Sequence, residues 1–295
     1  MVLATTERTD MAYDDLDLWS SDAVVHAMAT SQRDALTVVS AASPALSAAI
    51  EALASVLAAG GRLAYAGAGS SGLIAQLDRL ELPGTFGIPL DRLPLILAGG
   101  AEALQALDGG SEDDAAAGAA AIAFHGIGAG DAVICLSASG STPFTVAVAR
   151  AAAAHGVVTV GIACVASAPL LDACRYPVAV PTSPEVLAGS TRLAAGTAQK
   201  CALNILSTGV ALKLGHAYRG LMVNMVPDNA KLKRRAVAIV ERAARLAPDR
   251  AEEALVAADW SIKTAVTMAG GSIGAAEARE RLTRSGGDIR AALRS

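Results

Sequence analysis

The chain has 295 residues, of which 53% are hydrophobic and only 3% are aromatic, and its formal net charge is −4. This length fits one large domain, or one medium domain with an appendage, and the core has to be built mainly from Ala, Val, Leu and Ile. The charge is spread along the chain without a basic stripe, which argues against nucleic acid as a partner.

The N-terminal segment and the cysteines indicate the cellular compartment. Residues 1–20 are acidic and polar, which predicts an extended lead-in and not a signal peptide. None of the four cysteines forms a C-x-x-C pair, so buried free thiols in a reducing environment are expected. Charge, Gly or Pro interrupts the Ala-rich runs before they reach a membrane-spanning length. We therefore expect a cytoplasmic protein without a membrane segment.

Two helices are expected first, and an apolar strand follows them. The first helix covers about 23–39 and has Ser21 or Asp22 as its expected N-cap. The second begins at Ser43-Pro44, with proline in its first turn, and stops at Gly60-Gly61. The strand is expected over 63–66.

This strand leads into a glycine- and serine-rich loop, Gly67-Ala68-Gly69-Ser70-Ser71-Gly72, which we call the first loop. Apolar residues at helical spacing follow, and Glu81 stands at the expected end of that helix, before Pro83-Gly84. A strand, such a loop and a helix together build an anion site, because the helix N-terminus offers free N–H groups and the positive end of its dipole.

The middle of the chain alternates strands and helices. Further strands are expected at 93–98, 132–136, 157–163 and 176–180. The helices expected between them cover 101–107, 111–125 with Ser111 as cap, 143–155 and 168–174. This alternation indicates βαβ units and an α/β fold with a doubly wound, parallel, five-stranded sheet flanked by helices.

A second serine-rich loop, Ser137-Ala138-Ser139-Gly140-Ser141-Thr142, follows the strand at 132–136 and precedes a helix that starts at Pro143. We call it the second loop. Ligands of such sheets bind at the carboxyl ends of the strands. Because both loops fall at such ends, one ligand is expected to meet both.

The C-terminal part is expected to be helical. Gly189-Ser190-Thr191-Arg192 is expected to open a long helix to about Leu214, and another helix covers 229–246. From Arg250 onward, short helices are separated by glycine pairs. This appendage of roughly 45 residues is too small for much core of its own, so it is expected to pack on the main domain or on a partner chain.

The first loop satisfies G-x-G-x-x-G after a strand, so a dinucleotide site has to be considered. That site needs an acidic residue at the end of the second strand, where this chain has Gly99-Gly100. The serines in both loops instead favour the phosphate monoester of a small molecule. A plain tight turn is the alternative for either loop alone.

Two carboxylates and two cations are candidates for the chemistry. Glu81 stands among leucines, where desolvation would favour its acid form; the alternative is a helix-end acid bonded to backbone N–H groups. Glu112 is expected in the first turn of a helix, where complementing the helix dipole is the alternative. Arg192 and Lys200 lie eight positions apart, and either an anion contact or a salt bridge fits them.

Ordered matches through most of the chain then point to a family. They include Thr6-Glu7-Arg8, Gly60-Gly61-Arg62-Leu63, the first loop, Leu77-Asp78, Glu81, Pro83 to Gly87, Glu112-Asp113, Ser139-Gly140, Thr142-Pro143-Phe144, Pro184-Glu185-Val186, Gly189 to Arg192, Ala195 to Lys200 and Leu203-Asn204. With these residues the chain resembles the N-acetylmuramic acid 6-phosphate etherases, which carry a sugar isomerase (SIS) domain and are related to the glucokinase regulatory protein.

The resemblance implies a lead-in at 1–45, a SIS domain at 46–247 and a small helical, UBA-like module at 248–295. It also implies a homodimer with its site near the subunit interface and no metal or redox cofactor. The implied reaction cleaves the D-lactyl ether of N-acetylmuramic acid 6-phosphate, in cell-wall amino-sugar recycling. Its products are N-acetylglucosamine 6-phosphate and D-lactate.

The resemblance also implies the roles of individual residues. Glu81 matches the general acid that protonates the leaving ether oxygen, and Glu112 matches the general base that removes the proton from C2 of the ring-opened sugar. The implied substrate- and phosphate-binding residues are Gly69, Ser70, Ser71, Ser139, Gly140, Ser141, Thr142, Glu185, Ser190, Arg192 and Lys200.

Three positions depart from the family pattern. Leu73 and Ser141 stand where the family usually has Arg, and Ala194 stands where it usually has Lys. If these positions contact the ligand, each loses a charge-assisted bond worth about 1.5–3 kcal/mol. The alternatives that stay open are a non-catalytic sugar-phosphate-binding regulator and a sugar-phosphate isomerase.

Overall fold

The computed structural model describes residues 5–106 and 109–295. The chain divides into two compact units. Unit 1 comprises Met1–Arg79 and Asp91–Ser207, and unit 2 comprises Leu80–Leu90 and Thr208–Ser295. The domain boundaries expected after residues 45 and 247 stay predictions.

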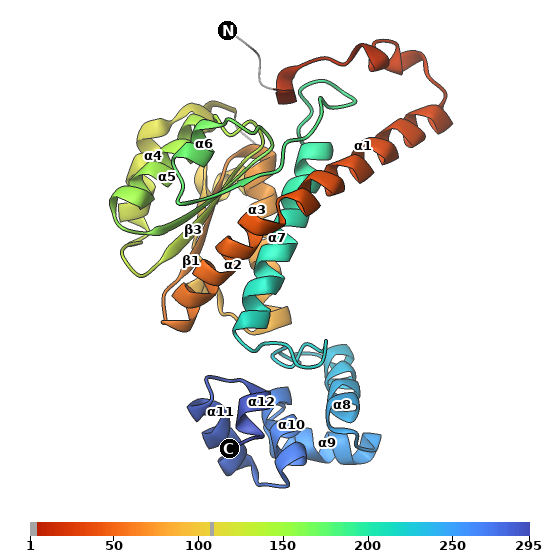
Figure 1. Ribbon diagram of the computed structural model, residues 1–295, viewed down its shortest axis with the longest axis vertical. Coiled ribbons are helices and arrows are strands. Elements are labelled where there is room, and N and C mark those ends of the chain that lie inside the picture. Colours follow the sequence, from red (N-terminus) through yellow and green to blue (C-terminus); the bar gives the residue numbers. More distant parts are fainter. Residues whose placement is uncertain (1–4, 107–108) are drawn as a thin grey trace. The chain divides into compact units, whose positions relative to one another are not determined.

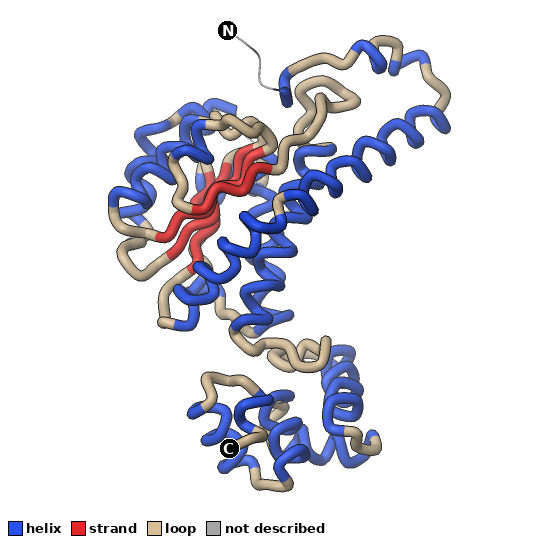
Figure 2. The backbone as a smooth tube through the Cα atoms, viewed as in Figure 1, coloured by secondary structure: helices blue, strands red, loops and turns tan. Residues whose placement is uncertain are grey.

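Unit 1 is built on a parallel sheet, which Figure 2 shows in red. Its strands are β1 (Leu63–Gly67), β2 (Leu95–Leu97), β3 (Ala132–Ser137), β4 (Val158–Ala163) and β5 (Tyr176–Ala179). In the described residues the spatial order is β2-β1-β3-β4-β5, and every neighbouring pair is parallel. The predicted five-stranded, doubly wound parallel sheet is therefore confirmed.

Helices cover both faces of this sheet (Figure 1). One face carries α4 (Ala115–Phe124), α5 (Pro143–Ala154) and α6 (Pro169–Asp172), and on the other face α2 (Ser43–Ala58) packs on β1, β4 and β5. All residues of β1 and β3 are buried. Central parallel strands with both faces covered read as continuous apolar runs, which is why sequence alone located them.

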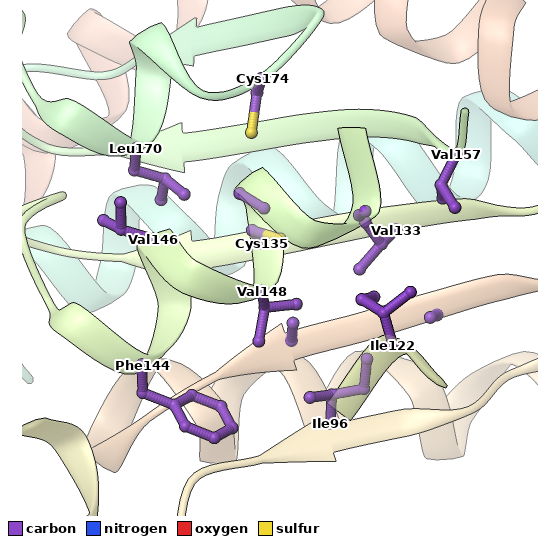
Figure 3. Packing of buried hydrophobic residues seen from close by; sticks show 14 of the residues in the cluster. Ile96, Ile122, Val133, Cys135, Phe144, Val146, Val148, Val157, Leu170 and Cys174 are labelled. Atoms are coloured by element: carbon purple, nitrogen blue, oxygen red, sulfur yellow. The ribbon is translucent and has the colours of Figure 1, made fainter. Parts of the chain in front are cut away.

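The core under α4, α5 and α6 is drawn in Figure 3. Ile122 of α4, Phe144 and Val148 of α5 and Leu170 of α6 pack on alternate strand residues such as Val133. Each fully buried aliphatic side chain contributes about 1.5–3 kcal/mol of transfer free energy. Cys135, Cys164 and Cys174 are buried free thiols in this unit, as expected, and Cys201 is half-buried.

The N-terminal helices differ from expectation by small shifts. The short 3-10 turns Thr5–Glu7, Met11–Tyr13 and Leu16–Leu18 precede α1 (Ser21–Ala41). Ser20, and neither Ser21 nor Asp22, caps α1, because its Oγ accepts the N–H of Ala23 at 3.2 Å. No single helix among the described residues has the length and apolarity of a membrane span; α1 and α2 meet those criteria only together, bent by 64° at their junction.

Helix α3 (Gly69–Phe86) is longer than predicted. It begins inside the first loop and continues through Pro83, where we expected it to stop. A proline inside a helix removes one N–H donor but does not always end it. The helix ends because Gly87, at φ +64°, takes a left-handed conformation while its N–H still bonds to the Pro83 carbonyl at 2.9 Å.

The segment between β2 and α4 also differs from the prediction. The 3-10 turns Leu90–Arg92, Gly100–Leu104 and Gly109–Asp113 flank β2 and precede α4. The helix expected at 101–107 is one such turn, and residue 107 lies outside the described residues. Asp114 caps α4 through the N–H of Ala117 at 2.8 Å, so Ser111 as its cap was wrong. The carboxylate of Asp114 takes the position because it stands next to the first helical residue.

Helix α7 (Ala194–Lys213) begins later than predicted, because residues 189–193 form turns before it. Unit 2 continues with α8 (Ala230–Ala244), α9 (Pro248–Ala257), α10 (Ile262–Gly271), α11 (Ala275–Arg284) and α12 (Ile289–Ala292). Val240 of α8, Leu255 of α9 and Val266 of α10 share one buried cluster. The short C-terminal helices thus gain a core by packing together with α8.

Candidate functional site

The two loops begin at the same edge of the sheet. β1 and β3 are neighbours, and their last paired residues are Gly67 and Leu136. The first loop leads into α3 and the second into α5. Parallel strands place their carboxyl ends together, so both loops start side by side in unit 1.

In the first loop, Gly69 is closely approached by Glu112. Gly69 has φ +51°, and a Cβ built on it would overlap Glu112 Oε1. The two residues are 43 positions apart, yet the carboxylate lies directly against the loop backbone. Ser71, which is buried, donates its Oγ hydrogen bond to Gln199 Oε1 at 3.0 Å. Ser70 is half-buried at the start of α3.

The second loop is held by bonds among its own residues. Ser137 Oγ accepts the N–H of Gly140 at 3.0 Å and lies 2.8 Å from Thr142 Oγ1. Ser141 donates to Ser139 Oγ from both its N–H, at 3.2 Å, and its hydroxyl, at 3.0 Å. These bonds curl the loop so that α5 can start at Pro143.

Glu112 lies on the 3-10 turn Gly109–Asp113, and not in the first turn of an α-helix as expected. Burial raises the pKa of its carboxyl, and the neighbouring charge of Asp113 raises it further. The residue is half-buried, so it is not sealed inside the core. A carboxylate whose pKa is raised toward neutrality is a better proton acceptor than an exposed one.

Glu81 belongs to unit 2 and lies on the C-terminal half of α3. Its residue is exposed in the single chain, and so are the flanking Leu77 and Leu80, at 49% and 51%. The expectation that leucines desolvate Glu81 is therefore wrong for the single chain. Only Leu82, one position on, is buried.

Glu185 has a structural partner at the start of α7. The residue is 1% exposed, and its two carboxylate oxygens accept the N–H groups of Ala194 and Ala195, each at 2.9 Å. Burial raises the pKa of this carboxyl, while the two backbone hydrogen bonds lower it. Glu185 thus caps the N-terminus of α7. Its position in the sequence did not predict this role.

The two predicted cations have different surroundings. Lys200 Nζ lies 3.7 Å from Asp78 Oδ1, so the salt-bridge alternative holds for it. Arg192 is exposed on the turn before α7. Ser190, on the same turn, is half-buried and its backbone N–H bonds to the Leu187 carbonyl at 3.0 Å. Arg192 therefore presents its charge to solvent from the 189–193 turn.

The three departures from the family pattern leave these positions without charge. Leu73 is 38% exposed one turn into α3. Ser141 is exposed and bonded to Ser139. Ala194 is buried, and Glu185 accepts its N–H.

Three residues that organise this region were not among the predicted site residues. Ser137 bridges the second loop, and its place as the first serine of that run was a usable signal. Asp78 is buried, accepts hydrogen bonds from Tyr65 and Ser207 and pairs with Lys200, and in the sequence only its charge inside an apolar helix marked it. Nothing in the sequence predicted that Gln199 contacts Ser71.

The described cavities of unit 1 include one at the second loop, of about 580 Å³, which is lined by Ser141, Pro143 and Arg150. One of about 770 Å³ is lined by the N-terminal segment, including Tyr13 and Trp19, and by Glu185 and Leu187. Another, of about 480 Å³, is lined by Gly99, Ser111 and residues of α4. Among residues 5–106 and 109–295, no cluster of three His, Cys, Asp or Glu side chains forms a metal site.

Comparison with known proteins gives a consistent result. A family model described as "SIS domain" matches residues 26–164. A Deinococcus radiodurans protein named N-acetylmuramic acid 6-phosphate etherase is 44% identical over 98% of this chain and 94% of its own length. A Synechocystis protein of the same name is 43% identical over the same shares.

Solved structures support the fold. A phosphoheptose isomerase from Francisella tularensis has a TM-score of 0.50 and 20% identity, and the match covers 64% of this chain and all of that one. At this identity the likeness speaks for the fold alone. Together with the full-length relatives, it leads to one conclusion. The chain belongs to the N-acetylmuramic acid 6-phosphate etherase family and is built on that family's SIS domain.

Proposed function

We propose that this protein is a carbon–oxygen lyase that cleaves the D-lactyl ether of N-acetylmuramic acid 6-phosphate, giving N-acetylglucosamine 6-phosphate and D-lactate. The observation that carries the proposal is the 40–44% identity, over nearly the whole chain, to four relatives named for this activity. The half-buried carboxylate of Glu112 against Gly69 supplies matching chemistry in unit 1.

Glu112 acts as the general base in this proposal. The proton at C2 of the ring-opened sugar is acidic because it is α to the aldehyde, so a carboxylate can remove it. Burial and the Asp113 charge raise the pKa of Glu112, which makes it a stronger base. The electron pair left at C2 expels the lactate oxygen from C3, and water then adds at C3.

Glu81 acts as the general acid. The lactate oxygen is a poor leaving group unless it is protonated as its bond to C3 breaks. Glu81 and Glu112 belong to different units, so we assign each role from family position.

The phosphate is proposed to bind at the two loops. The N-termini of α3 and α5 follow these loops directly, and each offers unpaired N–H groups and a positive dipole end to an anion. From the family pattern, the proposed phosphate contacts are Gly69, Ser70, Ser71, Ser139, Gly140, Ser141, Thr142, Ser190 and Arg192. The other two residues of that pattern are not proposed as contacts, because Glu185 caps α7 and Lys200 pairs with Asp78. With Leu73, Ser141 and Ala194 uncharged, hydroxyl and backbone donors contribute more of this binding than side-chain cations.

A cytoplasmic homodimer is proposed as the working form. Leu73 and Leu77 lie one turn apart on α3 and are both exposed in the single chain, and Ile205 of α7 is exposed as well. Exposed apolar side chains spaced for one helix face favour contact with another protein surface. A lead-in at 1–45 and a helical module at 248–295 remain part of this proposal.

One assay tests the reaction. The protein is incubated with N-acetylmuramic acid 6-phosphate, and D-lactate is measured for the parent and for Glu81→Gln, Glu112→Gln and Glu102→Gln. Glu102 is an exposed glutamate on the turn Gly100–Leu104 and serves as the matched control. We expect lactate from the parent and the control, and a loss of about 10²–10⁴-fold in the first two variants. A parent that releases no lactate refutes the proposal, and full activity in Glu81→Gln or Glu112→Gln refutes that role.

A second candidate is a sugar-phosphate-binding regulator without activity. The observation that favours it is the loss of charge at Leu73, Ser141 and Ala194. It predicts saturable binding of N-acetylglucosamine 6-phosphate by calorimetry but no lactate. A sugar-phosphate isomerase would instead interconvert an aldose and a ketose phosphate, using Glu112 but not Glu81.

A further inference from the structure

Asp78 is a buried carboxylate that the proposed reaction does not use. The residue is 1% exposed, in the middle of α3. Its Oδ2 accepts the Tyr65 hydroxyl at 2.8 Å, and its Oδ1 accepts the Ser207 hydroxyl at 3.1 Å. Lys200 Nζ lies 3.7 Å from the same Oδ1. A carboxylate is retained in a core only when its charge is paired and its oxygens are bonded.

The partners of Asp78 come from two other elements. Tyr65 lies in the middle of β1 and is fully buried, and burial followed by the Asp78 charge raises its pKa well above the usual range. It therefore stays protonated and donates. Ser207 and Lys200 lie on α7. Asp78 thus ties α3 both to the strand that precedes the first loop and to α7.

A second bond joins the same two helices near the loop. Ser71 of α3 donates to Gln199 of α7, and Ser71 and Asp78 are seven positions apart, on one face of α3. On α7 the corresponding partners, Gln199 and Ser207, are eight positions apart. The two hydrogen bonds therefore connect α3 and α7 at two levels about two turns apart, and the two helices run side by side in the same direction. We call these residues, with Lys200, the α3–α7 polar seam.

The seam fixes the part of α3 that begins in the first loop. The helix places Ser70 and Ser71 at its first turn, and the backbone of the loop touches Glu112 at Gly69. A shift of α3 along α7 would move these groups together. The buried carboxylate of Asp78 bonds to β1 as well as to α7. Its contacts therefore resist such a shift more than the Ser71–Gln199 hydrogen bond alone.

We propose that Asp78 is a positioning residue: its buried carboxylate, held by Tyr65, Ser207 and Lys200, fixes the start of α3 and so sets the place of the first-loop donors for the sugar phosphate. Lys200 then neutralises Asp78 and is not itself a phosphate ligand. The inference rests on the proposed function only for the identity of the ligand. It assigns Lys200 a different role from the one that the family pattern implies.

A double-mutant cycle separates the two roles of Lys200. The variants are Asp78→Asn, Lys200→Met and the two combined, with KM and kcat for lactate release measured for each. We expect each single change to raise KM by about tenfold, with a smaller change in kcat. In the double variant both charges of the pair are removed together. Its fold-rise in KM is therefore expected to be smaller than the product of the two single fold-rises. If the fold-rise in KM of the double variant equals or exceeds that product, the inference is overturned, because Lys200 would then contact the ligand independently of Asp78.

A readout without activity keeps the proposal separate from the proposed reaction. Amide hydrogen exchange of residues 70–77 is expected to speed up in Asp78→Asn, while exchange over 143–150, at the start of α5, stays unchanged. Asp172→Asn, an exposed acid on α6, is the matched control and changes neither. If the parent releases no lactate, the cycle is run on the dissociation constant for N-acetylglucosamine 6-phosphate. Unchanged exchange at 70–77 in Asp78→Asn overturns the proposal whether or not the protein is a lyase.

Two more conservative variants test the inference in case Asp78→Asn does not fold. Tyr65→Phe and Ser207→Ala each remove one hydrogen bond and leave the ion pair with Lys200 in place. Each is expected to raise KM in the same direction by a few-fold, the size of one hydrogen bond. An unchanged KM and unchanged exchange in both variants contradict the inference.

Discussion

The two loops look alike in sequence but are stabilised in different ways. The second loop is closed by its own residues, since Ser137 bonds Gly140 and Thr142 and Ser139 accepts from Ser141. The first loop takes its order from distant segments, with Glu112 against Gly69 and Gln199 bonded to Ser71. The conformation of a loop that bonds to itself is determined by local sequence. A loop that is held by residues far away in the chain positions its ligand relative to those residues. The first loop is therefore where the proposed catalytic carboxylate, Glu112, lies against the proposed anion site.

The largest effect is expected from breaking the contact between the first loop and Glu112. In Gly69→Ala the new Cβ overlaps Glu112 Oε1 and must displace the carboxylate. We expect kcat for lactate release to fall by about 10²-fold, since a misplacement of about 1 Å can cost that much.

Gly100→Ala is the matched control for this change. Gly100 has φ +64°, so alanine suffers a similar backbone strain there, but no atom lies within 4 Å of the added Cβ. Its thermal midpoint is expected to fall as in Gly69→Ala while kcat stays near that of the parent. Equal loss of kcat in both variants would show that strain, and not displacement of Glu112, is responsible.

A smaller effect is expected from opening the second loop. Ser137→Ala removes the acceptor for the Gly140 N–H and the contact with Thr142 Oγ1. We expect KM to rise by about tenfold, which corresponds to one or two lost hydrogen bonds, with kcat little changed. Steady-state kinetics of lactate release measure this split.

The comparison variant for Ser137→Ala is Ser55→Ala, which removes an exposed hydroxyl bonded to the Glu51 carbonyl on α2. It should leave KM unchanged. If Ser137→Ala also leaves KM unchanged, the second loop does not bind the phosphate. The difference in how the two loops are stabilised would then have no consequence for substrate binding.

The smallest effect is a shift in pH dependence. With Glu112 as the proposed base, activity is expected to fall as pH drops through its raised pKa. Burial is the larger cause of that raised pKa and the Asp113 charge the smaller one, so Asp113→Asn lowers the pKa only in part. The acidic limb of kcat/KM is expected to move to lower pH by less than about one unit.

Asp91→Asn, which removes an exposed carboxylate from the turn Leu90–Arg92, controls for a general change in charge. Its pH profile should match that of the parent. A shift of the acidic limb to higher pH in Asp113→Asn would contradict the role of Asp113 and the assignment of Glu112 as the titrating base.

Much of the fold was predictable because the strands are short, apolar and bounded by glycines. The boundaries of β1, β3 and β4 agree with prediction within one residue at each end. Helix boundaries were less predictable, since they depend on which of several neighbouring polar residues caps a helix. Asp114 caps α4 in place of Ser111, and α3 passes Pro83 to end at Gly87.

The sequence by itself determined the parallel α/β fold, the position of both loops at strand ends and the family, because each depends on local pattern or ordered identity. Only the tertiary structure decided that Glu112 lies against Gly69, that Glu185 caps α7 and that Lys200 pairs with Asp78. These contacts join segments that lie up to 122 positions apart in the chain, in the case of Asp78 and Lys200. Local periodicity records which face of an element is buried, but the packing of one element on another decides which side chain it meets there.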